Sequence, residues 1–129
     1  MHNYYKILIL LLLSYSTMAD SLTEFDYIDG NNNIYHISPK LLEYQPITPD
    51  QSSSGIYSGG HAVKKHLNNE DYQLLINAVQ TALNNHAIHI EQRLMGSAMI
   101  VYNNKKTTVL LKHDAKETQA LDLFLKTLR

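Results

Sequence analysis

Residues 68–85, NNEDYQLLINAVQTALNN, carry the clearest local structural signal in the chain. Apolar side chains recur at positions 72, 75, 76, 79, 82 and 83, which is the spacing of a helix with one apolar face. Asn68 can cap the first turn, and Asp71 stands where the positive end of a helix favours a carboxylate. The stretch therefore predicts an amphipathic helix that begins after Asn68, ends near Asn84 and Asn85, and packs against a sheet.

The residues that follow this helix change to the pattern of strands. Polar and apolar residues alternate over 88–91, and residues 98–102 are apolar on both faces, as expected of an interior strand. Gly96 marks a bulge or a break between these two segments. Residues 103–106 are typical of a hairpin loop, and 107–111 of the strand that returns from it.

The residues before the helix predict a second hairpin. Short runs of aromatic and β-branched residues at 25–28 and 34–37 flank the turn-forming stretch 29–33. Residues 41–44 are the candidate for a third short strand, limited by the prolines that follow it.

The end of the chain predicts a second helix, with Asp114 as its cap and an apolar stripe at positions 120, 121, 124, 125 and 128. The full order is then β-β-(β)-loop-α-β-β-α. This order predicts a single α+β domain over residues 20–129, an antiparallel sheet of four to five strands with two helices packed on one face.

Composition excludes several classes of protein. The chain has 129 residues, 11 Lys and Arg against 12 Asp and Glu, and no cysteine. A net charge of −1 lacks the basic excess typical of nucleic-acid binding. The absence of cysteine excludes a disulfide framework, a thiolate metal cluster and a cysteine nucleophile.

Residues 1–19 have the organisation of a secretory signal peptide. Lys6 precedes an unbroken apolar run at 7–13, and Thr17-Met18-Ala19 supplies small residues at a cleavage site before Asp20. The apolar run is shorter than the roughly 20 residues that span a bilayer. We expect cleavage, export to the periplasm or the exterior, and no membrane span in the mature chain.

The stretch 46–60 is the candidate recognition element. It is long for a connection in a small domain and is rich in Pro, Ser and Gly. Tyrosine offers a large rigid contact surface, whereas serine and glycine adapt their hydrogen bonds, a combination suited to protein recognition. The candidate partner-binding residues are Ser54, Gly55, Tyr57, Ser58, Gly59, Gly60 and His61.

The alternative site is a metal- or small-ligand-binding set formed by His86, His89 and Glu91. In a strand His89 and Glu91 project from one face, His86 lies just before it, and zinc accepts such donors. No nucleophile elbow or phosphate-binding loop occurs, so we expect no enzyme and no cofactor. The favoured interpretation is a small exported protein that binds another protein, as an inhibitor, an immunity protein or an envelope accessory protein.

Overall fold

The computed structural model describes residues 22–129, so the expected signal peptide lies outside the described residues. The strands are β1 (Phe25–Ile28), β2 (Ile34–Ser38), β3 (Leu41–Gln45), β4 (Val63–His66), β5 (His89–Ile90), β6 (Ala98–Tyr102) and β7 (Thr107–Leu111). The helices are α2 (Asn69–Asn84) and α3 (Lys116–Leu128), with the short 3₁₀ turns η1 (Pro49–Gln51) and η2 (His86–Ile88).

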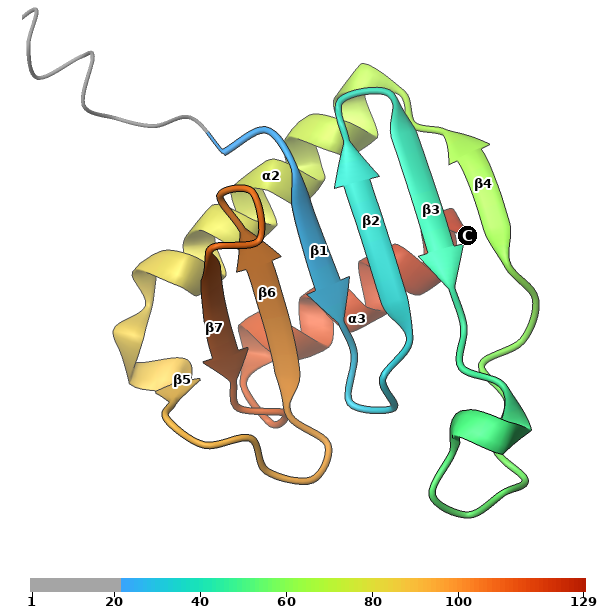
Figure 1. The fold of residues 1–129 in the computed structure, drawn as a ribbon. Helices are drawn as coiled ribbons and strands as arrows, with labels where there is room; N and C mark the ends of the chain where they lie inside the picture. The colour runs from blue at the N-terminus through green and yellow to red at the C-terminus, as the bar shows by residue number, and fades with distance from the viewer. Residues whose placement is uncertain (1–21) are drawn as a thin grey trace, which may run out of the picture.

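The strands form one antiparallel sheet in the order β4-β3-β2-β1-β6-β7-β5. Both helices lie behind the same face of this sheet, and neither α2 nor α3 covers the other face, called here the open face (Figure 1). The expected α+β domain is confirmed. Among residues 22–129 neither helix has the length and apolar character needed to cross a membrane.

The expected strand count of four to five is wrong, because the sheet has seven strands. The sequence Val63-Lys64-Lys65-His66 lacks apolar alternation, yet it forms β4 by pairing with β3 at the edge of the sheet. Charged residues are common on such edges, where they discourage pairing with other chains. Of the two alternatives expected at Gly96, a bulge or a break, the structure has the break: β5 pairs with β7 and is separate from β6.

The core lies between the sheet and the helices. Alternate residues of β1, β2 and β3 face the helices, and three of them are the fully buried tyrosines Tyr27, Tyr35 and Tyr44. The rings of Tyr35 and Tyr44 are 4.7 Å apart between centroids, a distance at which tilted rings attract each other. Leu75, Val79, Leu121 and Leu125 of the two helices complete this core.

Of the two predicted helix N-caps, the one for α2 is confirmed and the one for α3 is wrong. Asn68 is the N-cap of α2, and its Oδ1 accepts a hydrogen bond of 2.8 Å from the backbone N–H of Asp71. Asp114 is not the cap of α3, because a turn closed by the N–H of Ala115 on the carbonyl of Lys112 delays the helix. Ala115 occupies the N-cap position and offers no side-chain acceptor.

The break predicted as one of two alternatives at Gly96 and the hairpin loop predicted at 103–106 are both present. Gly96 lies in a turn that breaks the chain between β5 and β6, with φ of 81°, a conformation that favours glycine. Asn103, Asn104 and Lys105 adopt positive φ in the hairpin loop between β6 and β7. Asparagine tolerates this left-handed region better than most residues, which explains the two asparagines there.

Candidate functional site

The long loop between β3 and β4, residues 46–62, is fixed to the sheet at its base. The Tyr44 hydroxyl donates a hydrogen bond of 2.6 Å to the Gly59 carbonyl, and the Gly59 N–H donates to the Ile47 carbonyl at 3.1 Å. Arg129 donates to the same Gly59 carbonyl at 3.3 Å, and its guanidinium lies 4.1 Å from the centre of the Tyr44 ring. These contacts clamp the returning arm of the loop against β3.

A second set of contacts ties this loop to the hairpin turn 29–33. The Asn33 side chain donates to the Tyr57 hydroxyl at 3.1 Å and accepts from the Ile47 N–H at 3.0 Å. Asp29 in turn accepts hydrogen bonds from the backbone and the side chain of Asn33. Asn33 is thus a buried bridge whose donors and acceptors serve two loops at once.

The tip of the loop is exposed. Ile56 has 84 % of its surface exposed, although a large aliphatic side chain usually finds cover. Gly55 beside it adopts φ of 76°, and no atom lies within 4 Å of the position a Cβ would take there. The loop therefore has a braced base and an apolar tip that projects from the sheet (Figure 1).

The structure divides the seven sequence-predicted partner-binding residues between these two parts. Tyr57 is half-buried and Gly59 is buried, so both belong to the base. The exposed members are Ser54, Gly55, Ser58, Gly60 and His61. Sequence reasoning did not select Ile56 as a contact residue, although an aliphatic residue amid serines and glycines was a visible signal.

Two further exposed apolar residues lie in the connection between β5 and β6. Leu94 has 63 % of its surface exposed, and Met95 is fully exposed. Sequence reasoning assigned this segment to a strand or its interruption and therefore missed both side chains.

The alternative metal set is not assembled in the described part of the chain. The rings of His86 and His89 are 5.2 Å apart between centroids, but Nε2 of His89 lies 2.9 Å from the Ala82 carbonyl at the end of α2. That nitrogen is engaged as a hydrogen-bond donor, and Glu91 is exposed. Within residues 22–129 no three His, Asp or Glu side chains are placed to hold a metal ion.

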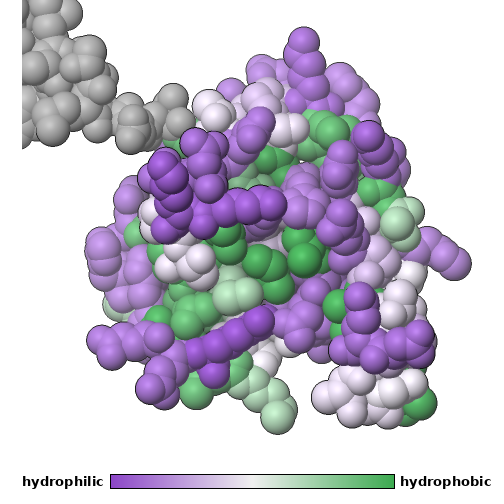
Figure 2. All heavy atoms as spheres, in the orientation of Figure 1, coloured by the Kyte–Doolittle hydropathy of each residue, from purple (hydrophilic) through white to green (hydrophobic). Residues whose placement is uncertain are grey.

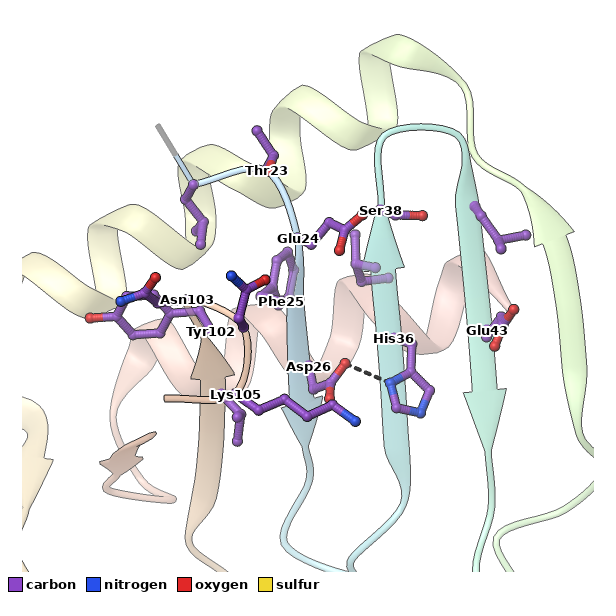
Figure 3. Close-up of a pocket in the computed structure, with 15 residues that line it drawn as sticks. Thr23, Glu24, Phe25, Asp26, His36, Ser38, Glu43, Tyr102, Asn103 and Lys105 are labelled. Carbon is purple, nitrogen blue, oxygen red and sulfur yellow. Dashed lines mark hydrogen bonds and ion pairs between the residues drawn. The ribbon is translucent and has the colours of Figure 1, made fainter. Parts of the chain in front are cut away.

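A pocket of about 730 Å³ opens on the open face, where apolar and polar side chains are interspersed (Figure 2). At its floor Nδ1 of His36 donates a hydrogen bond of 2.5 Å to Asp26, and Nε2 of His36 lies 3.2 Å from the Gln45 side chain. Glu24 and Glu43 flank this pair, and Lys105 reaches toward Asp26 from the β6–β7 turn (Figure 3). The pocket thus joins a hydrogen-bonding floor to apolar walls formed by Leu22, Leu41 and Val101.

Comparison of the chain with protein-family models, with characterised proteins and with solved structures gives no match.

Proposed function

We propose that this chain is a small exported protein that acts by binding another protein, as an inhibitor, an immunity protein or an envelope accessory protein. The contact is made by the loop residues 52–61. The observation that carries the proposal is the exposed Ile56 on a loop whose base is clamped by Tyr44, Asn33 and Arg129.

The physical reason concerns the cost of ordering a loop on binding. A loop that is already held in place loses little conformational entropy when a partner covers it. Burial of one isoleucine side chain contributes about 1.5–3 kcal/mol, and flanking serine hydroxyls adapt to polar groups of the partner. The loop thus combines an apolar anchor with adaptable polar contacts.

The binding test uses the mature chain as bait in envelope extract from the cell that makes it. Ile56→Ser removes the exposed anchor without touching the braced base, and Leu74→Ser removes an exposed leucine of helix α2 as the matched control. We expect a specific partner to be recovered with the parent and with Leu74→Ser and to be lost with Ile56→Ser. Equal recovery with all three proteins would contradict the assignment of this loop.

Export is tested separately. Sequencing of the amino terminus of the protein purified from its native cell should give Asp20 as the first residue. Recovery of the chain from the cytoplasm with Met1 still attached would overturn the export part of the proposal.

A second candidate function, binding of a small ligand, is favoured by the pocket at the Asp26–His36 pair. Its volume of about 730 Å³ lies in the range of small-molecule sites. Saturation-transfer NMR with a library of small polar fragments tests this candidate. Fragments that bind the parent chain but not His36→Ala would support it, and binding unchanged by the substitution would contradict it.

A further inference from the structure

The register of the sheet brings four connecting segments to one end of the molecule. Ile28 at the end of β1 pairs with Ile34 at the start of β2 and with Met99 beside the start of β6, and Gln45 at the end of β3 pairs with Ile34. The segments 29–33, 46–62 and 91–97 therefore leave the sheet at the same end (Figure 1). Leu111 at the end of β7 pairs with Ala98, which adds the segment 112–115. We call these four segments the loop end.

Direct contacts join neighbouring members of the loop end. The Arg93 side chain donates a hydrogen bond to Oδ1 of Asn32, which ties segment 91–97 to segment 29–33. Gly30 and Gly96 approach so closely that a Cβ on Gly30 would lie 2.5 Å from the Gly96 carbonyl oxygen. On the other side, Asn33 ties segment 29–33 to Tyr57 and Ile47. The hairpin turn in the middle thus braces the loops on both sides of it.

The two outer loops each present apolar side chains to solvent. Ile56 projects from segment 46–62, and Leu94 and Met95 project from segment 91–97. The described residues contain two other large hydrophobic side chains of comparable exposure, Leu74 and Leu123, and both lie on helices. Exposed apolar anchors on two loops that are braced by the turn between them offer one partner several contacts at a low cost in conformational entropy.

Charge at the loop end decides the kind of partner. The exposed charged side chains of the four segments are the acidic Asp50, Glu91 and Asp114 and the basic Arg93 and Lys112, whereas Asp29 is buried against Asn33. With histidines neutral these exposed charges sum to −1, and Arg93 is held in place by its hydrogen bond to Asn32. The small acidic excess favours a positively charged surface over the anionic surface of a membrane.

We infer that the loop end is one composite interface, and that its occupant is a protein with apolar pockets bordered by basic residues. Ile56 fills one pocket, and Leu94 and Met95 fill a second. This inference rests on the proposed function and extends it from one loop to the whole end of the sheet. The acidic side chains around the anchors contribute to the rate of association and to specificity.

Site-specific photo-crosslinking in the intact native cell tests the inference. A benzophenone amino acid is placed at position 56, at position 95 or, as the control, at position 123 on helix α3. We expect adducts to the same protein from positions 56 and 95 and none from position 123. The adduct identifies the partner, which is then purified for titration calorimetry with the full chain.

Calorimetry then separates the two proposals. Met95→Ser and Ile56→Ser should each weaken binding at least about tenfold, Leu123→Ser should leave it unchanged, and Glu91→Lys should weaken it and reduce its salt dependence. Loss of binding with Ile56→Ser but not with Met95→Ser would overturn the composite interface and would leave the single-loop function supported. Adducts to lipid, or no adduct from either tip, would contradict both.

Discussion

At the scale of single residues, the pair formed by Tyr27 and Asp122 links the sheet to helix α3. The buried Tyr27 hydroxyl donates a hydrogen bond of 2.5 Å to the Asp122 carboxylate. Burial raises the pKa of both groups, because each charged form loses hydration; the bond from Tyr27 opposes part of the effect on Asp122. Asp122 therefore accepts its hydrogen bond from Tyr27, whose hydroxyl also lies 3.5 Å from the Thr118 carbonyl.

Removing the Tyr27 hydroxyl should destabilise the fold. Tyr27→Phe leaves the half-buried Asp122 carboxylate without its donor, at an expected cost of about 1–3 kcal/mol in the free energy of unfolding. Urea unfolding at neutral pH measures this cost. Tyr102→Phe, which alters a half-exposed tyrosine, is the control, and equal stability of the two variants would contradict the importance of the bond.

Asp122 should also make stability depend on pH. Because the pKa of Asp122 in the folded chain is raised above its ordinary 3.8, the folded chain holds a proton that the unfolded chain has released. Stability contributed by this group is thus present below 3.8 and is lost as the pH rises through the folded pKa. The side chain introduced by Asp122→Asn has no proton to release. The free energy of unfolding of the variant should therefore rise relative to that of the parent as the pH increases from acid to neutral.

Urea unfolding of both proteins below pH 3.8 and at neutral pH measures that difference. Titrating groups that do not interact with Asp122 are shared by the two proteins and cancel in the comparison. A constant difference between the two proteins over this interval would contradict the raised pKa of Asp122.

At the scale of elements, predictability follows the range of the interactions that define each element. Helix α2 was predicted with its cap because the cap bond joins Asn68 to Asp71, three residues away, and the apolar stripe is local. Strand β4 was missed because its partner β3 lies across the long loop and its own residues are charged. The cap of α3 was misplaced because a turn from Lys112 to Ala115 comes first.

The candidate site was predictable only in part, for the same reason. The composition of residues 46–60 indicates a recognition loop, but it does not show that Tyr57 and Gly59 turn inward to Asn33 and Tyr44. Those contacts come from another strand and another turn. The exposure of Met95 likewise depends on the break at Gly96, whose consequence for neighbouring side chains is not local in sequence.

The glycines of the long loop should differ sharply in their tolerance of a methyl group. A Cβ on Gly59 would lie 2.8 Å from Cβ of Pro46 and press on the Asn33 side chain, an overpacking cost of about 1–3 kcal/mol. A Cβ on Gly55 meets no atom within 4 Å, so Gly55→Ala costs only its left-handed strain, about 1 kcal/mol.

Limited proteolysis within residues 46–62, together with urea unfolding, compares the two alanine variants. We expect Gly59→Ala to be cleaved faster than the parent because its loop base is displaced, and Gly55→Ala to resemble the parent. Faster cleavage of Gly55→Ala than of Gly59→Ala would show that the contacts at the base do not hold the loop in place.

At the scale of the whole molecule, stability depends on packing between one sheet and two helices. The chain has no cysteine to form a disulfide, so the buried face of each helix must supply the stabilisation. Leu121 and Leu125 of α3 and Val79 of α2 are fully buried there.

Alanine substitutions on the buried face and on the exposed face of α3 should separate the contribution of packing from that of helix propensity. Leu121→Ala removes a fully buried side chain, at an expected cost of about 2–5 kcal/mol, whereas Leu123→Ala alters a side chain with 66 % of its surface exposed. Because alanine is a good helix former, the second change should cost less than about 0.5 kcal/mol. Thermal unfolding followed by circular dichroism measures both, and similar melting temperatures would contradict the assigned core.

The position of β1 has a kinetic consequence. This strand comes first among the described strands, yet it pairs with β6 as well as with β2. The pairs β2–β3, β3–β4 and β6–β7 are consecutive in the chain, and β5 and β7 are separated only by β6. Bringing Tyr27 and Ile100 together closes a long stretch of chain, and this costs conformational entropy before any contact across the pair offsets it. The pairing of β1 with β6 should therefore form late in folding. Until it forms, the apolar edges of β1 and β6 are uncovered.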